Sequence, residues 1–283
     1  MTMYEKVDLT IESYETKTRE VILSECKNMD SKLLKSILPN STKFPEWYGL
    51  PKDHKQNLPL RPVVAACDSP TTGVSIVLER ILQQLIQFVP AHLANTTEAI
   101  THICDACPGL NAPDGTIVMS VDVVGLYPSI PIREGVQAVV DMLQQYFQRI
   151  DMFGLSVSGV RNLLLFVLSH NYFRFGHQIY HQVDGVAMGN NLAPPFAILF
   201  MHTVEARLLQ DSPLVPLLYK RYIDDILLLW THGRDSLMRF VQHFNSAHPS
   251  INFTYELSEA STIPDRKASF PELWMGQTVQ QLQ

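Results

Sequence analysis

Tyr222-Ile223-Asp224-Asp225 lies between two apolar, strand-like runs, Leu217–Arg221 before it and Ile226–Trp230 after it. A buried carboxylate without a partner is costly, so two adjacent ones in such a place require a cation or hydrogen bonds. A tight hairpin that lifts both carboxylates to the edge of a sheet, beside a divalent metal ion, meets this requirement. An isolated pair of aspartates is more typical of a solvated turn, so the hairpin reading depends on further signals.

Length and composition set broad limits. The chain has 283 residues, of which 46% are hydrophobic and 18% charged, which fits one large domain or two modest ones with a real core. The formal net charge of −6 argues against binding nucleic acid by bulk charge alone. It leaves room for a local basic track, because phosphate contacts depend on where lysine and arginine lie.

The sequence carries no export or membrane signal. The first 17 residues are polar and mixed in charge, unlike a signal peptide, and no apolar run approaches the ~18 residues of a membrane span. We therefore expect an intracellular protein, nuclear or cytoplasmic and not secreted. Cys104 and Cys107 form one CxxC motif without a second pair, which favours reduced thiols over a zinc site.

Apolar periodicity predicts an α+β fold. Alternating residues predict strands at Thr116–Asp122 and Ile251–Leu257, and a hairpin over Tyr172–Gln182 that turns at Gly176-His177. We expect the helices to pack on one face of an antiparallel sheet. Apolar residues at helical spacing predict these helices at Val74–Phe88, Glu134–Ile150, Ser156–His170, Leu192–Leu209 and Arg234–Asn245.

Three aspartates form the candidate catalytic set. Phosphoryl transfer to a growing strand uses two divalent ions about 3.5–4 Å apart. Hard ions such as Mg²⁺ prefer carboxylate oxygens, and an aspartate at the end of one strand beside a hairpin pair could supply them. We predict Asp122, Asp224 and Asp225 as metal ligands, with one further oxygen from the backbone carbonyl of Val123.

Two further segments fit a nucleotide site. Tyr127 lies five residues beyond Asp122, where an aromatic ring could lie under an incoming sugar, clash with a 2′-hydroxyl and favour dNTP; the alternative is a core aromatic. Gly185 and Gly189, four residues apart before a helix, would let the backbone approach a base and sugar closely. The alternative for these glycines is an ordinary loop-to-helix turn.

Basic residues near the N-terminal half suit a triphosphate. Lys52, Lys55 and Arg61 lie on adjacent loops, where arginine can grip phosphate oxygens bidentately and lysine adds a point charge. The alternative is a solvated basic loop.

In order and spacing, five motifs together resemble those of reverse transcriptases. The nearest resemblance is to the Penelope-like retroelement family, which is related to telomerase reverse transcriptases, and it covers about three-quarters of the chain. It implies a right-hand polymerase that copies an RNA template into DNA, using a DNA primer, dNTP and two Mg²⁺ ions, or Mn²⁺ in their place. The motifs are Gly49–Lys55, Leu60–Val64, Asp122–Pro131, Gly185–Asn190 and Tyr222–Trp230.

The resemblance assigns roles to individual residues. It gives a catalytic triad, a sugar-gate aromatic, two triphosphate-binding residues in the fingers and a turn that positions template and nucleotide. The catalytic triad matches Asp122, Asp224 and Asp225, and the sugar-gate aromatic matches Tyr127. The triphosphate-binding residues match Lys52 and Arg61, and the positioning turn matches Gln182, Gly185 and Gly189.

The resemblance also predicts a domain order. Residues 1–45 would be a polar, partly helical extension, 46–115 the fingers and 116–258 the palm with inserted fingers helices. Residues 259–283 form a divergent tail where the family continues into a thumb. Without a thumb to hold the duplex, we expect an RNA-directed DNA polymerase of poor processivity.

Two other functions stay open at this stage. The chain could be a catalytically silent remnant that binds RNA or a protein. It could also be an RNA-dependent RNA polymerase, since such enzymes share the palm and its paired aspartates, although Tyr127 disfavours this.

Overall fold

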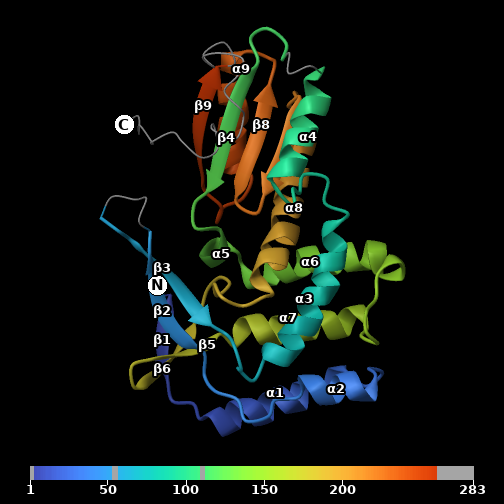
Figure 1. Cartoon of the computed structure of the whole chain (residues 1–283), viewed down its shortest axis with the longest axis vertical. Helices are drawn as coiled ribbons and strands as arrows, with labels where there is room; N and C mark the ends of the chain where they lie inside the picture. Colours follow the sequence, from blue (N-terminus) through green and yellow to red (C-terminus); the bar gives the residue numbers. More distant parts are fainter. Residues whose placement is uncertain (1–2, 53–56, 109–111, 260–283) are drawn as a thin grey trace. The chain divides into compact units, whose positions relative to one another are not determined.

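Two compact units divide the chain in the computed structural model, which describes residues 3–52, 57–108 and 112–259 (Figure 1). The first unit combines Met1–Pro90 with Gly125–Ala206, and the second combines Ala91–Val124 with Arg207–Gln283. These units cut across the predicted fingers and palm ranges, because residues 125–206 group with the N-terminal part of the chain. The assignment of fingers and palm therefore stays a prediction.

A five-stranded sheet organises the first unit. The hairpin predicted over residues 172–182 is confirmed, with its two strands flanking Gly176 and His177. One neighbouring pair is parallel, at Glu46 and Arg174, and the other pairs are antiparallel. In spatial order the strands are β1 (Tyr4–Val7), β6 (Gln178–Gln182), β5 (Tyr172–Phe175), β2 (Glu46–Pro51) and β3 (Leu60–Ala65).

Helices account for most of the rest of the first unit. Polar caps set several starts: Thr10, Asp30 and Ser156 each accept a hydrogen bond from a backbone N–H in the first turn that follows. The predicted helices are confirmed, with ends displaced by a few residues. In this unit the confirmed helices are α3 (Thr72–Ile86), α6 (Ile132–Tyr146), α7 (Val157–Ser169) and α8 (Ala193–Asp211), whose last turns belong to the second unit. The 3₁₀ turn η2 (Phe147–Arg149) ends the range predicted for α6. The structure also has α1 (Ile11–Glu25) and α2 (Ser31–Ile37), in the extension expected to be partly helical, and the short α5 (Leu126–Ser129), which was not predicted.

A four-stranded antiparallel sheet organises the second unit. The strands predicted at residues 116–122 and 251–257 are confirmed within a few residues. The sheet carries the helices α4 (Thr96–Ala106) and α9 (Arg234–Ser246). In spatial order its strands are β7 (Leu218–Tyr222), β8 (Asp225–Trp230), β4 (Ile117–Val123) and β9 (Phe253–Glu259).

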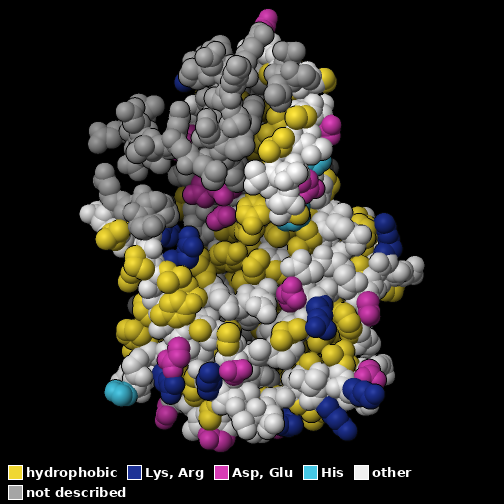
Figure 2. All heavy atoms as spheres, in the orientation of Figure 1, with side chains coloured by type: hydrophobic (Ala, Val, Ile, Leu, Met, Phe, Trp, Pro, Cys, Tyr) yellow, Lys and Arg dark blue, Asp and Glu magenta, His cyan; other side chains and the backbone are white. Residues whose placement is uncertain are grey.

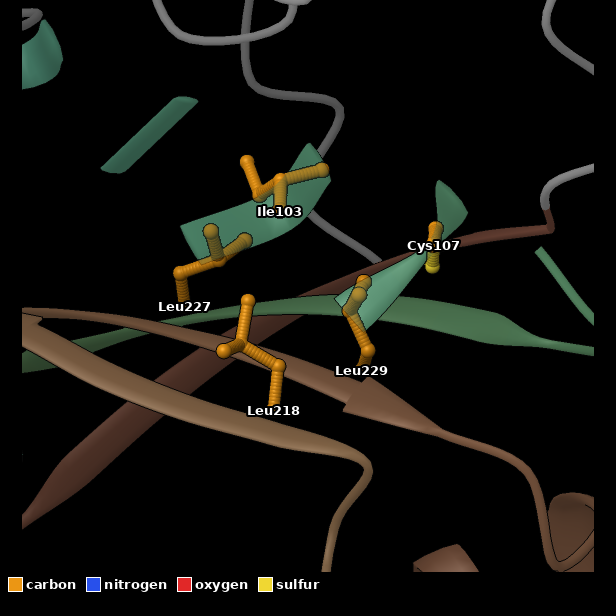
Figure 3. Packing of buried hydrophobic residues seen from close by; sticks show 5 residues of the cluster. All are labelled: Ile103, Cys107, Leu218, Leu227 and Leu229. Carbon is orange, nitrogen blue, oxygen red and sulfur yellow. The ribbon is translucent and has the colours of Figure 1, made fainter. Parts of the chain in front are cut away.

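Helices cover both faces of this second sheet. On one face lies α9 (Figure 1). Its Phe240 packs against Trp230 of β8, with ring centroids 4.9 Å apart. On the other face Ile103 of α4 and Cys107, the residue after the helix, point toward leucines of β7 and β8 (Figure 3). The expectation that helices lie on one face only is therefore wrong, because the leucines that alternate with Trp230 need an apolar cover of their own.

Helix α4 was not predicted from the sequence, although its start carries a clear signal. The Oδ1 atom of Asn95 accepts from the N–H of Glu98 at 2.9 Å, and the Glu98 carboxylate accepts from the N–H of Ala94 at 2.7 Å. Asn95 is thus the N-cap of α4, and Glu98 ties the residue before it to the first turn of the helix. Cys107 of the CxxC motif ends this helix inside the apolar cluster, where burial raises the pKa of its thiol.

No helix among the described residues is both long and apolar enough to cross a bilayer.

Candidate active site

A two-residue turn carries the paired aspartates. Tyr222 pairs with Asp225 across the β7–β8 hairpin, which leaves Ile223 and Asp224 as the loop. Ile223 has a φ of +54° and Asp224 does not have a positive φ, which is the sign pattern of a type II′ turn. Glycine favours this first position, and a β-branched residue there is strained. Asp224 therefore follows a residue whose backbone conformation is unfavourable for an isoleucine.

The neighbouring strand brings the third aspartate to the hairpin. Asp122 lies directly opposite Asp225 in the β4–β8 ladder, so the two side chains share one face of the sheet. The N–H of Val123 donates to the carbonyl oxygen of Asp224 at 3.2 Å, which joins the end of β4 to the turn. The predicted arrangement, a strand-end aspartate beside a hairpin pair, is therefore present in the backbone.

Like charges crowd at this end of the sheet. Asp225 is half-buried, and burial, followed by the charges of Asp224 and Asp122, raises the pKa of its carboxyl to about 6. Acidic side chains gather at the end of β4 in Figure 2. A divalent cation would relieve this repulsion, and three carboxylates match the hard oxygen donors that Mg²⁺ prefers. The donor chemistry therefore fits the metal that the sequence predicts.

The side chains do not form a finished metal cage. Among the residues that the structure describes, no three His, Cys, Asp or Glu side chains are arranged so as to hold a metal ion. Asp122 and Thr254, which face each other across β4 and β9, are both exposed to solvent, as is Tyr222. This end of the sheet face is thus open to water and to ligands, whereas α4 covers the leucines at the other end.

The glycine segment of the first unit packs against its own chain. Gly185 has a φ of +71°, and a Cβ placed there would lie 2.4 Å from the backbone of Pro128. Gly189 has a φ of +106°, and its Cβ would lie 2.3 Å from the carbonyl oxygen of Val64. These close approaches explain both glycines without a ligand, so their predicted role beside a nucleotide stays a prediction.

The same segment links Tyr127 to β3. The N–H of Val186 donates to the carbonyl oxygen of Tyr127 at 2.8 Å, and the N–H of Val64 donates to Met188 at 2.7 Å. The buried Gln182 holds the start of the segment, since its side-chain amide donates to the carbonyl oxygen of Asp184 at 2.9 Å. Tyr127 itself is half-buried in α5.

The predicted phosphate-binding residues follow the β2–β3 hairpin. Arg61 lies exposed on β3, and the half-buried Lys52 follows β2, with its N–H donating to Pro59 at 2.9 Å. Hydrophobic side chains gather over this hairpin in Figure 2. Tyr48 and Leu50 of β2 are both exposed. The predicted partner Lys55 lies outside the described residues.

The predicted residues thus form two groups. The second unit holds the carboxylates and Val123, and the first unit holds the residues assigned to the nucleotide. The sequence reading gave no role to Arg221, which is fully buried and donates from Nη1 to the carbonyl oxygen of Ile223 at 2.8 Å. An arginine inside an apolar strand, two residues before the turn, was the signal for it.

Comparison with solved structures shows a polymerase-like fold. Telomerase from Candida albicans, in complex with a fragment of telomeric RNA, matches with a TM-score of 0.59 and 11% identity, over 92% of this chain and 50% of that one. Apo telomerase from Candida tropicalis, truncated from its C-terminal domain, matches with a TM-score of 0.57 and 11% identity, over 89% of this chain and 56% of that one. The BmCPV RNA-dependent RNA polymerase at its elongation state matches with a TM-score of 0.55 and 13% identity, over 90% of this chain and 24% of that one.

These matches define the class of fold. The chain has a reverse-transcriptase-like fold of mixed helices and antiparallel sheets, similar to the folds of these telomerases and of the viral RNA-dependent RNA polymerase. It spans about half the length of these telomerases and about a quarter of the viral polymerase. No protein-family model matches the sequence, and a search of curated proteins also gave no match.

Proposed function

We propose that this chain is the reverse-transcriptase domain of a retroelement, an RNA-directed DNA polymerase that adds dNTPs to the 3′-hydroxyl of a DNA primer. One observation carries the proposal: Asp122 and Asp225 pair at an open sheet end beside Asp224, and burial together with the charges of Asp224 and Asp122 raises the pKa of the Asp225 carboxyl. Such crowding is unfavourable in the isolated protein and is typical of sites that bind a cation.

The carboxylates would bind two Mg²⁺ ions through their oxygens, and such ions supply an activated hydroxyl and a stabilised leaving group. Asp122 and Asp225 hold a fixed spacing because they pair directly across two strands. Asp224 comes from the turn, so its position depends on the backbone of the hairpin. The chain's own contribution is the placement of acidic oxygens on a rigid sheet.

Nucleotide recognition would fall to the residues that the resemblance assigns. Arg61 and Lys52 would contact the triphosphate, since both are on the β2–β3 hairpin and at least partly accessible. Tyr127 would select against a 2′-hydroxyl. Gln182 and the two glycines would set the turn that positions template and nucleotide.

Single-nucleotide extension of a DNA primer on an RNA template tests the proposal. We expect Mg²⁺-dependent incorporation of dNTP that falls by at least ~10³-fold in Asp224→Ala, because removing a ligand of the catalytic ions forfeits several kcal/mol of transition-state stabilisation. Asp235→Ala is the matched control, since Asp235 is an exposed carboxylate on α9. Incorporation that survives Asp224→Ala would reject the site.

An RNA-dependent RNA polymerase is the second candidate, favoured by the match to the BmCPV enzyme over 90% of this chain. The same assay with rNTP separates the two. We expect a preference for dNTP that falls by at least ~10-fold in Tyr127→Val, the order of discrimination that one steric contact supplies. A wild-type preference for rNTP would establish the second candidate instead.

A silent remnant that binds RNA or a protein is the remaining alternative. Binding of dNTP that requires Mg²⁺ would count against it. RNA binding with the same affinity in the presence of Mg²⁺ or EDTA, without any nucleotide addition, would support it.

A further inference from the structure

Arg221 occupies an unusual place for a charged side chain. It is fully buried on β7, on the sheet face opposite the one that Tyr222 and Asp225 share. Burying a guanidinium costs several kcal/mol unless its charge and donors are well partnered. Leucine or methionine would fill such a site without that cost, so the arginine calls for a specific reason.

One of its hydrogen bonds reaches the central peptide of the turn that carries Asp224. Nη1 donates to the carbonyl oxygen of Ile223 at 2.8 Å, and this carbonyl belongs to the peptide that joins Ile223 to Asp224. Turns of type I′ and type II′ differ mainly by a flip of this peptide. The hydrogen bond therefore selects one of the two orientations.

The next peptide of the turn is held as well. The carbonyl oxygen of Asp224 accepts from the N–H of Val123 at 3.2 Å. The two peptide planes on either side of the Asp224 Cα are thus fixed, one by a charged donor and one by β4. Since the backbone of Asp224 sets the direction of its Cα–Cβ bond, fixing both planes fixes the bond from which the carboxylate extends.

The main chain of Arg221 is anchored on its outer side. Its N–H donates to the carbonyl oxygen of Ala91 at 2.6 Å, and its carbonyl oxygen accepts from the N–H of Leu93 at 2.8 Å. The guanidinium therefore projects from a backbone that is itself held. This support allows the strained φ of +54° at Ile223 to persist.

We propose that Arg221 is the positioning residue for Asp224, locking the central peptide of the turn in the orientation that presents this carboxylate beside Asp122 and Asp225. The link to metal binding rests on the function proposed above, whereas the locking of the peptide does not. A test can therefore separate the two.

Hydrogen exchange tests the lock directly. In Arg221→Met we expect amides of the β7–β8 hairpin to exchange about 10- to 100-fold faster than in the wild type. This fold-change corresponds to the loss of one hydrogen bond to a charged group. Amides of α9 should be unchanged, and so should the whole protein in the control Arg239→Met, an exposed arginine on that helix. Unchanged exchange at the hairpin would overturn the proposal.

A double-mutant cycle excludes a role in packing alone. Glycine suits the first position of a type II′ turn, so Ile223→Gly should reduce the effect of Arg221→Met on hairpin exchange by at least ~3-fold. If Arg221 only fills space, the two effects will be additive. Should Arg221→Met fail to fold, Arg221→Lys serves in its place, because lysine keeps the charge and loses the fixed fork of donors.

Mn²⁺ binding, measured by electron paramagnetic resonance with the metal alone, reads out the consequence. We expect Arg221→Met to weaken Mn²⁺ binding by at least ~10-fold. Adding Ile223→Gly to that variant should restore part of the lost affinity. Wild-type protein that binds no Mn²⁺ would reject the proposed function, and the exchange data would still decide the role of Arg221. Unaltered Mn²⁺ affinity in a variant with fast hairpin exchange would overturn the positioning of Asp224.

Discussion

Two turns of this molecule both contain residues with positive φ angles, but they place different residue types there. In the segment from Gln182 to Gly189, positive φ angles fall on glycines, and the space that a side chain would fill is taken by the chain itself. In the aspartate hairpin, a positive φ falls on Ile223, and like charges meet beside it. The first turn is arranged for packing, whereas the second retains strain and repulsion.

This difference indicates where function lies. Local conflicts that persist in a folded protein gather at sites with another purpose, because the surrounding structure must hold them in place. Substitutions should therefore have opposite signs in the two turns. Alanine in the glycine segment should destabilise the protein, while substitutions that relieve strain or charge repulsion in the hairpin should stabilise it. Those that remove a carboxylate should also impair the proposed activity.

Gly185→Ala should have the largest effect. Its Cβ would lie 2.4 Å from the Pro128 backbone at a φ of +71°, so we expect a loss of about 3 kcal/mol or more in the free energy of unfolding. Gly176→Ala is the matched control, since its φ is +61° and no atom lies within 4 Å of the added carbon. It should lose only about 1 kcal/mol in urea denaturation. Equal losses would show that the close contact with Pro128 is unimportant.

Asp225→Asn should stabilise the metal-free protein near neutral pH. The folded state raises the pKa of Asp225 from 3.8 to about 6, so it holds this proton more tightly than the unfolded state. Stability should therefore fall as pH rises through this window. Above it, the variant should exceed the wild type by about 1 kcal/mol, after allowance for solvent around a half-exposed carboxylate.

The pH dependence supplies the control for that prediction. Below pH ~4 both states carry the proton, so the difference between wild type and Asp225→Asn should vanish. Denaturation with EDTA across this range measures it. A gain that is independent of pH would mean that the amide acts through packing or hydrogen bonding and not through the relief of charge.

Ile223→Gly should have the smallest effect. Relief of strain at a φ of +54° favours the variant by about 1–2 kcal/mol, and the greater freedom of glycine in the unfolded chain offsets part of this. We expect a net gain of about 0.5 kcal/mol in thermal denaturation. A clear loss would mean that the isoleucine side chain contributes more through packing than its backbone costs.

Local patterns predicted most of the elements but not their partners. Periodicity found the helices and the strands of the second sheet, because those segments are long and alternate clearly between apolar and polar residues. It missed β1, since Tyr4–Val7 is short and pairs with β6, more than 170 residues away in sequence. It also missed α4, although an asparagine followed three residues later by a glutamate, Asn95 and Glu98, is a typical start signal for a helix.

The candidate site was partly predictable for the same reason. The aspartates stood out because carboxylates are rare between apolar runs. The pairing of Asp122 with Asp225 is a matter of register between distant strands, and the sequence alone does not contain it. The role of Arg221 depends on which way one side chain points from β7, and the positions of Gly185 and Gly189 depend on contacts with Pro128 and Val64.

One measurement tests the central claim most directly: the melting temperatures of wild type and Asp225→Asn, in EDTA and in saturating Mg²⁺, at a pH well above 6. If the three carboxylates form a metal site, the variant melts higher in EDTA and the order reverses in Mg²⁺, because a bound ion stabilises the folded state that it prefers. This result does not depend on processivity. If Mg²⁺ leaves the order unchanged, the carboxylates are not a metal site and the proposed polymerase chemistry fails with it.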